Sequence, residues 1–309
     1  MRVVSLLPSA TEIGYALGIE PVGVSHECDY PPRAAELPAA NRSLVDPTAS
    51  TAEINEQVEA AMDDHDGVYD VRRDVLRELD PDLILTQGIC DVCAVDSVLV
   101  EDALAELDLD ARVLTTDPHS LEDVFEDVRL IGEATGRTER AESLVADLRE
   151  RVRAVERAVP SRAATPRVAV LDWMQPPMTS GHWIPGMVER AGGAYGLAEP
   201  RVPSRPIAWE DVLEYDPEVL VVAPCGFDLD TTHDRLDELT GRDGWQDLSA
   251  VQSGRVYAID GNHYVNRPGP RLVDTLEYFA AILHPETFES PPSDAVERLA
   301  TKPASPSGR

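Results

Sequence analysis

Lysine is almost absent from this chain of 309 residues, since Lys302 near the C-terminus is the single one and arginine supplies the other basic side chains. Acidic residues number 57 against 27 basic ones, which gives a formal net charge of −30. So acidic a surface repels the phosphates of nucleic acids and of anionic lipids, which argues against both as partners. A dispersed acidic surface is also typical of proteins from a high-salt cytoplasm, where salt screens the self-repulsion.

Long apolar runs are missing too. No stretch approaches the roughly 20 apolar residues that a membrane helix requires, so no membrane insertion is expected. The chain starts at Met1 and enters an expected strand at once, without an apolar signal segment. As written it is expected in the cytoplasm, and outside the cytoplasm if the start is incomplete.

Cysteines are too few for a disulfide scaffold, and they would be reduced in that compartment. Cys90 and Cys93 form a C-x-x-C, which could bind zinc, act as a redox pair or pack as small apolar side chains. Cys28 and Cys225 are isolated and expected in different lobes, so they do not supply the second ligand pair of a structural zinc site.

Common enzyme motifs are absent as well. The sequence has no nucleophile-elbow serine motif, no P-loop and no complete G-x-G-x-x-G. We therefore expect a binding protein rather than an enzyme, with no catalytic cofactor.

What the sequence does contain is an alternation of short β-branched runs with helical patterns, typical of parallel sheets covered by helices. The pattern pauses after the first four runs and then restarts, and the chain length suits two domains. The prediction is an α/β protein with two sheets and therefore two lobes. The expected strands lie at 3–6, 22–25, 83–86 and 113–115 in the first lobe and at 167–171, 219–222 and 256–259 in the second.

The connection between the lobes is predicted to be helical. Ser120 is expected to start a helix that ends near Ala134, and Thr138 to start a second that runs to about Ala158 with one apolar face. About 20 residues span about 30 Å, so this helix is a stiff link that favours small adjustments over hinge closure. The expected divisions are a lobe at 1–120, a connector at 121–160, a lobe at 161–289 and a disordered, proline- and serine-rich tail at 290–309.

Candidate ligand-binding residues are those that follow the strands, because ligands bind beyond the carboxyl ends of open parallel sheets. For Ser9 a helix N-cap is the simpler alternative, and for each histidine a loop hydrogen bond. Taken together they favour a ligand in the cleft between the lobes. The candidates are Ser9, His26, Gln87, Cys90, Cys93, Trp173, His182, Trp183, Phe227, His263 and Tyr264.

Histidines and aromatics in these loops suit a flat ligand that contains a metal. Neutral imidazole binds cobalt, iron or zinc, and His182 or His263 is the candidate ligand of such a metal. Aromatic side chains offer large contact areas at small entropic cost and would cover a macrocycle well.

Four segments carry a resemblance to a known family: LLPSATEI at 6–13, DPDLILTQ at 80–87, WEDVL at 209–213 and GRVYA at 254–258. Together they resemble the substrate-binding proteins of ABC importers for cobalamin and iron chelates, over about residues 1–288. GHW at 181–183 and RPGPR at 267–271 make the cobalamin-binding branch the nearest likeness.

The resemblance implies two Rossmann-like lobes bridged by a long backbone helix, with a corrinoid in the cleft and little closure on binding. It also implies one acidic residue on each lobe that docks onto permease arginines. Glu210 matches in the second lobe, with a solvated helix-start carboxylate as the alternative, and Asp96 or Glu101 in the first. The exported cobalamin receptors have an aromatic residue where this chain has Gln87.

Three hypotheses follow. The leading one is a protein that binds cobalamin or a related corrinoid, either for an importer with its permease and ATPase or as a cytoplasmic relative. The second is a receptor for another metal chelate, a haem or a siderophore. The third is a cytosolic thiol- or metal-dependent enzyme that uses Cys90 and Cys93.

Overall fold

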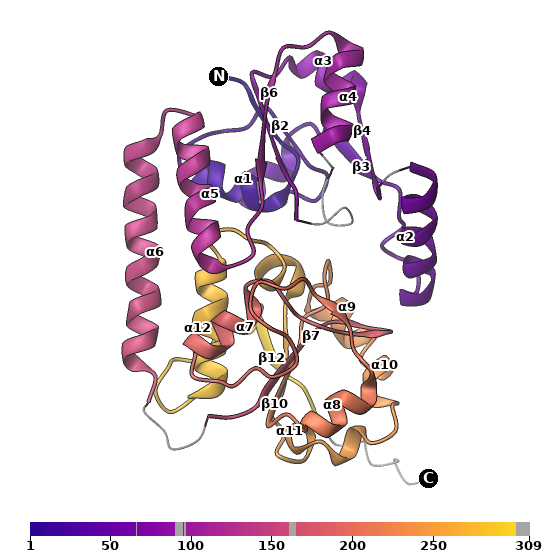
Figure 1. Ribbon diagram of the computed structural model, residues 1–309, viewed down its shortest axis with the longest axis vertical. Coiled ribbons are helices and arrows are strands. Elements are labelled where there is room, and N and C mark those ends of the chain that lie inside the picture. Colours follow the sequence, from indigo (N-terminus) through magenta and orange to yellow (C-terminus); the bar gives the residue numbers. More distant parts are fainter. Residues whose placement is uncertain (66, 90–94, 96, 161–164, 301–309) are drawn as a thin grey trace. The chain divides into compact units, whose positions relative to one another are not determined.

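The computed structural model describes residues 1–65, 67–89, 95, 97–160 and 165–300. Contacts within the chain divide it into two compact units (Figure 1). Unit 1 comprises Met1–Arg149 with Pro268–Pro270, and unit 2 comprises Glu150–Arg267 with Arg271–Arg309. The main sheet of unit 1 is parallel and that of unit 2 is mixed, and each sheet is accompanied by helices. The expected α/β class is therefore confirmed.

Unit 1 is built on a four-stranded parallel sheet with the strand order β2-β1-β5-β6. Its central strands are apolar and fully buried, as the short β-branched runs predict. A separate antiparallel pair joins β3 to β4. The strands are β1 Val3–Ser5, β2 Gly23–Val24, β3 Asn41–Ser43, β4 Tyr69–Val71, β5 Leu83–Gln87 and β6 Arg112–Thr116.

The helices of unit 1 bury apolar faces against these strands. One core cluster joins Val4 and Ile84 of the sheet to Leu76, Val100 and Leu104 of two helices. The helices are α1 Pro8–Ala16, the 3₁₀ helix η1 Pro32–Glu36, α2 Thr51–His65, α3 Arg73–Leu79, α4 Ser97–Leu107 and α5 Leu121–Ala134.

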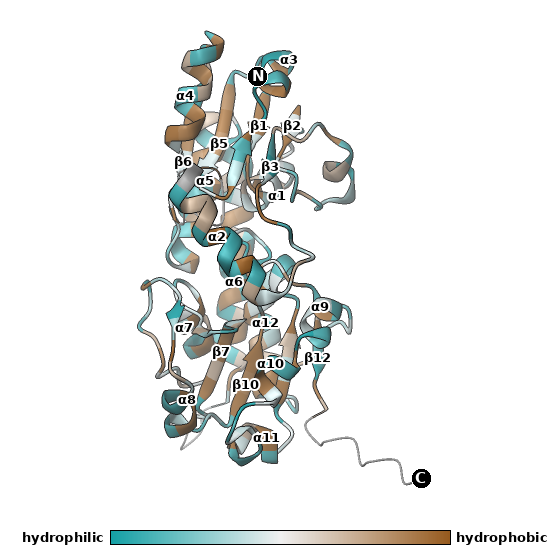
Figure 2. Cartoon of the chain, turned by 90° about the vertical axis from the view of Figure 1, so that its right-hand side faces the viewer, coloured by the Kyte–Doolittle hydropathy of each residue, from teal (hydrophilic) through white to brown (hydrophobic). Residues whose placement is uncertain are grey.

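Unit 2 contains a six-stranded mixed sheet with the order β12-β11-β10-β7-β8-β9. Its three central strands are parallel and buried, and β7 and β10 are brown in the hydropathy colouring of Figure 2. The flanking strands are antiparallel. The strands are β7 Val168–Met174, β8 Pro177–Thr179, β9 Arg205–Pro206, β10 Val219–Val222, β11 Val256–Ile259 and β12 Val296–Arg298.

Short helices connect the strands of unit 2, and α12 is its most apolar helix, with nine buried residues. Within the described residues, no helix is both long and apolar enough to span a bilayer. The helices are α7 Ile184–Arg190, α8 Trp209–Tyr215, α9 Leu229–Asp234, α10 Asp237–Thr240, the 3₁₀ helix η2 Trp245–Asp247, α11 Ser249–Gln252, the π-helical turn η3 Gly261–Val265 and α12 Leu272–Leu283.

The helical connector has the expected form. The Ser120 hydroxyl accepts a hydrogen bond from the Asp123 backbone N–H at 3.3 Å and so caps α5. After a break at 135–137, α6 runs over Thr138–Ala158 as one helix. Its predicted apolar face is buried, and Gly132 of α5 lets Ala141 approach closely, since a Cβ on Gly132 would lie 2.5 Å from the Ala141 Cβ.

The expected disordered tail from residue 290 is wrong for the described part, which ends at residue 300. Strand β12 pairs antiparallel with β11, and the Leu299 N–H donates to the Val256 carbonyl at 2.9 Å. Ala295 and Leu299 are buried. The pairing of β12 with the otherwise open edge strand β11 and the burial of Ala295 and Leu299 outweigh the Pro/Ser-rich composition of this stretch.

Candidate functional site

The end of β7 and the loops that follow β10 and β11 lie together in unit 2, and hydrogen bonds tie them to one another. The Cys225 N–H donates to the Asp172 carbonyl at 3.0 Å, and the Asn262 N–H donates to the Phe227 carbonyl at 3.0 Å. The Asn266 side chain donates to the Ala223 carbonyl at 3.1 Å. The structure therefore brings several of the predicted site residues of unit 2 to one edge of its sheet, as expected for an open parallel sheet.

An aromatic pair joins the end of β7 to the loop after β10, because β7 continues past the expected end at residue 171 to Met174 and so includes Trp173. The rings of Trp173 and Phe227 are tilted by 49° with their centroids 5.1 Å apart. Phe227 is buried, whereas Trp173 is partly exposed and its indole N–H donates to the Gln175 carbonyl at 3.1 Å. The Arg235 guanidinium lies 5.0 Å from the centre of the Phe227 ring. The pair thus offers an apolar surface with one fixed and one accessible ring.

His263 follows β11 in the turn η3 and is held by a buried carboxylate. Its Nδ1 lies 2.7 Å from Asp260 Oδ2, and its backbone N–H donates to Asp260 Oδ1 at 2.7 Å. The side chain of Asp260 is 5% exposed and that of His263 is 35% exposed. An ionised carboxylate only accepts hydrogen bonds, so Nδ1 carries the proton. In the neutral ring the lone pair is then on Nε2.

Tyr264 faces a different neighbour. Its ring packs edge-on against Tyr278 of α12 at 5.3 Å, and the Arg271 guanidinium lies 5.2 Å from its centre. The Tyr264 carbonyl accepts a hydrogen bond from the Thr275 hydroxyl at 2.8 Å. In the structure Tyr264 therefore anchors the turn to α12.

His182 and Trp183 lie in a tightly packed turn. His182 has a left-handed backbone with φ of 50°, and its N–H donates to the Val202 carbonyl at 2.6 Å. Only glycine fits before it, because a Cβ on Gly181 would lie 2.2 Å from the same carbonyl oxygen. Trp183 is 7% exposed and its indole donates to the Val265 carbonyl at 2.9 Å, so it links this turn to the turn after β11.

Asp172 is a buried acid beside this turn that the sequence analysis did not single out. Burial raises its pKa to about 6, partly offset by the hydrogen bond that the Ser204 hydroxyl donates to Oδ2. Ser204 in turn accepts a hydrogen bond from the Gly181 N–H at 3.0 Å. The signal available in the sequence was an acid directly after an apolar strand and next to a tryptophan.

Among the described candidates of unit 1, Ser9 and Gln87 are buried and His26 is exposed. Ser9 is 4% exposed and lies inside α1, whose N-cap is Leu7 with Pro8 at the first helical position, so the N-cap alternative for Ser9 is wrong. Gln87 ends β5 and is 7% exposed. His26 Nδ1 lies 3.1 Å from the Asn41 side-chain oxygen, the loop hydrogen bond that was the alternative for this residue.

The cysteines do not form a shared site in the described residues. Cys28 is buried, with its Sγ 3.1 Å from the Thr11 hydroxyl, and Cys225 is exposed in unit 2. Cys90 and Cys93 lie outside the described residues, so the thiol hypothesis stays a prediction. Across the described part of the chain, no three His, Cys, Asp or Glu side chains are grouped to hold a metal ion.

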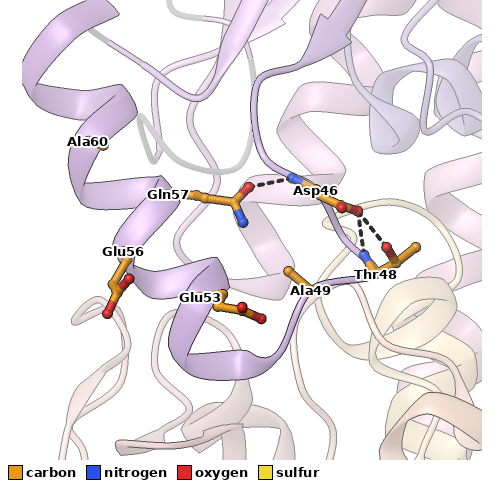
Figure 3. Close-up of a pocket in the computed structure, with 7 residues that line it drawn as sticks. All are labelled: Asp46, Thr48, Ala49, Glu53, Glu56, Gln57 and Ala60. Carbon is orange, nitrogen blue, oxygen red and sulfur yellow. Dashed lines mark hydrogen bonds between the residues drawn. The ribbon is translucent and has the colours of Figure 1, made fainter.

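Unit 1 has a hollow of about 550 Å³ between the β3–α2 loop and α2 (Figure 3). Two of its three acids are engaged in local turns, because Asp46 accepts from the Thr48 N–H and hydroxyl and Glu53 accepts from the Ser50 N–H and hydroxyl. These bonds lower the pKa of both carboxyls. The hollow contains none of the residues expected from the sequence. It is lined by Asp46, Thr48, Ala49, Glu53, Glu56, Gln57 and Ala60.

Glu210 is exposed in the first turn of α8, next to the buried Trp209. Trp209 stacks on Trp245 with centroids 6.2 Å apart, and its indole donates to the Asp243 carbonyl at 2.9 Å. The position suits either reading of Glu210, a docking carboxylate or a charge that favours the helix N-terminus. Its docking role stays a prediction.

The chain belongs to the periplasmic binding protein family, whose sequence profile matches residues 3–262. It is similar to a Cobalamin-binding protein of Halobacterium salinarum, with 28% identity over 294 residues, 93% of this chain and 70% of that protein. This confirms the resemblance at the level of the family and makes the chain a substrate-binding protein by class.

Two solved structures share its fold. The periplasmic vitamin B12-binding protein BtuF of Vibrio cholerae has a TM-score of 0.65 and 24% identity and covers 91% of this chain and 96% of its own. A periplasmic haem-binding protein from Pseudomonas aeruginosa has a TM-score of 0.73 and 20% identity, with 98% and 99% covered. Both likenesses show the fold alone.

Proposed function

We propose that this protein binds a flat metal chelate, cobalamin or a related corrinoid, without catalysing a reaction. The observation that carries the proposal is the partly exposed Trp173 ring at the end of β7, which packs on Phe227, whose loop is hydrogen-bonded to the turn that holds His263. Aromatic rings supply contact area for a macrocycle, and an imidazole supplies a donor for its metal. The inter-lobe cleft expected from the sequence stays a prediction.

The name of the Halobacterium salinarum relative supports a corrinoid as the ligand. Its substrate-binding family supports a role beside an ABC permease and ATPase, with a cytoplasmic handling protein as the alternative. The second candidate function is haem binding. It rests on the same aromatic and imidazole groups, which suit an iron porphyrin equally well, and on the fold shared with a haem-binding protein.

Calorimetric titration of the purified protein with hydroxocobalamin, hemin and a ferric siderophore tests the proposal. We expect saturable one-to-one binding of hydroxocobalamin, and a weaker or absent response to the siderophore. Saturable binding of hemin with no response to hydroxocobalamin would favour haem binding, the second candidate function, over corrinoid binding. No binding of any of the three would reject a chelate-binding function.

The Trp173→Ala variant tests whether the aromatic pair contributes. Removal of a partly exposed ring that contacts the ligand is expected to weaken binding about thirtyfold, as for an aromatic hot spot worth about 2 kcal/mol. Phe288→Ala is the matched control, because Phe288 is a half-buried aromatic of unit 2 that packs on His284 outside these loops. Equal effects of the two substitutions would contradict a ligand contact at Trp173.

A further inference from the structure

The three candidate histidines differ in the group that contacts the imidazole ring. His263 Nδ1 faces the carboxylate of Asp260 at 2.7 Å, and that carboxylate is 5% exposed. His26 Nδ1 faces a neutral amide oxygen of Asn41, which also accepts the His26 backbone N–H at 2.9 Å. The His182 ring is stacked on Trp183 with centroids 5.4 Å apart.

A buried carboxylate behind an imidazole has a definite chemical effect. It fixes the proton on Nδ1 and increases electron density on Nε2, the arrangement that orients metal-bound histidines in proteins. Asp260 also accepts the His263 backbone N–H at 2.7 Å, so the carboxylate and the ring are held by two hydrogen bonds rather than one. The ring is oriented before any ligand arrives.

The surroundings of the ring suit a macrocycle. The Asn262 N–H, one residue before His263, donates to the Phe227 carbonyl at 3.0 Å and ties the turn to the loop of the Trp173–Phe227 pair. The His263 side chain is 35% exposed, so a third of its surface is accessible. An equatorial chelate supplies its own in-plane donors, so one imidazole is enough to complete an axial position.

We infer that His263 Nε2 coordinates the metal of the bound chelate axially, with Asp260 as the positioning residue. The inference rests on the proposed function and narrows its ligand class to chelates with an exchangeable axial position. A complex whose six positions are all filled by its own chelator has no place for this donor. Coordination is a ligand exchange, in which the bond from the metal to axial water breaks, Nε2 donates its lone pair, and water leaves without redox change.

The test uses aquacobinamide, a corrinoid with exchangeable axial ligands and no nucleotide base of its own. Binding to the wild-type protein is followed by quenching of tryptophan fluorescence, and coordination by the visible spectrum of the corrinoid. We expect the bound spectrum to match that of the imidazole complex of the same corrinoid. Dicyanocobinamide, whose axial positions are filled by cyanide, is the matched probe and is expected to bind without that spectrum.

Three variants separate the roles. His263→Ala is expected to abolish the imidazole-type spectrum while aquacobinamide still quenches fluorescence. Asp260→Asn keeps an acceptor for the backbone N–H but loses the charge, and we expect affinity to fall about tenfold to a hundredfold with the spectrum retained. His233→Ala, in the exposed part of α9, is the control and should leave the spectrum unchanged. Thermal unfolding curves establish that each variant is folded.

The outcomes are distinguishable. Binding of aquacobinamide with no imidazole-type spectrum, or with a spectrum that survives in His263→Ala, overturns the axial inference and leaves the proposed function standing. No binding of either cobinamide, of hydroxocobalamin or of hemin rejects the function and with it the inference. A Soret shift of hemin that is lost in His263→Ala, with no response to corrinoids, assigns the same donor to an iron porphyrin.

Discussion

The two units differ in the groups that support their accessible candidate side chains. In unit 1, Ser9, Gln87 and Cys28 are all less than 10% exposed and lie within the packed structure. In unit 2, Trp173 and His263 are partly exposed, and the groups that hold them are buried. Both units share a parallel sheet, so the fold does not explain the difference. His26 of unit 1 is also exposed, but a neutral amide of Asn41 lies behind its imidazole, whereas the buried carboxylate of Asp260 lies behind the imidazole of His263.

The largest expected effect concerns how rigidly unit 2 holds its loops. In Gly181→Ala, the new Cβ would lie 2.2 Å from the Val202 carbonyl and 2.6 Å from two further backbone atoms, so the 199–204 segment must move. We expect the free energy of unfolding to fall by about 3 kcal/mol, measured by urea denaturation.

The matched control is Gly186→Ala in α7, where an added Cβ would meet no atom within 4 Å. There alanine favours the helix and the expected change is a gain of about 0.5–1 kcal/mol. A Gly181→Ala protein as stable as this control would show that the turn before His182 is loosely held. It would contradict the view that unit 2 holds its candidate side chains rigidly.

Most strands and the helical connector are predictable from the sequence, because their local patterns agree with their burial in the fold. The apolar runs form strands within one residue of their expected bounds, except that β7 continues three residues further to Met174, and Ser120 caps α5 as its spacing before Asp123 indicates. Strand β12 was not predictable, because its order depends on an edge of β11 far away in the chain. Strands β8 and β9 each include a proline, which a sequence pattern associates with loops.

The candidate site was predictable in position but not in detail. Strand ends identify Trp173, Phe227 and His263, since parallel topology gathers such ends at one edge. Burial is a property of the folded structure, so the sequence does not reveal that Trp183 is enclosed or that a carboxylate supports His263. The three-residue spacing from Asp260 to His263 is the one local signal, because an acid at an N-cap commonly accepts the N–H three residues on.

Each unit contains a buried carboxyl group whose pKa is raised. Asp127 of α5 is 7% exposed and its Oδ2 has no hydrogen-bond partner among the described residues. Burial, with repulsion from Asp123, Asp117 and Glu126, raises its pKa to about 7. Asp172 of unit 2 is also buried, but it has the Ser204 hydroxyl as a donor and its pKa is raised only to about 6.

Asp127→Asn is expected to stabilise the protein above pH 7. The folded state holds the proton up to about pH 7 and the unfolded state releases it near pH 4, so the wild type loses stability as pH rises between these values. At pH 8 we expect the variant to gain about 2 kcal/mol over the wild type in urea denaturation, and at pH 4 almost nothing. Exposed Asp147→Asn on α6 should change stability by less than about 0.5 kcal/mol at either pH. An Asp127→Asn protein that is destabilised at pH 8 would mean that the carboxylate is paired.

The smallest expected effect tests whether Ser204 is what distinguishes the acid of unit 2. Ser204→Ala removes the donor to Asp172 and the acceptor of the Gly181 N–H, so a buried carboxylate loses a hydrogen bond and its pKa rises further above about 6. At pH 8 we expect the free energy of unfolding to fall by about 1 kcal/mol. At pH 5 the carboxyl is already protonated in the folded state, so the loss should be smaller, because a neutral acid is less costly to bury. Ser253→Ala is the control, since that hydroxyl donates to the Ser249 carbonyl at an exposed helix end and its removal should show no such pH dependence. Equal losses at both pH values would mean that Ser204 acts through the Gly181 turn alone, and that the two units do not differ in how they accommodate a buried charge.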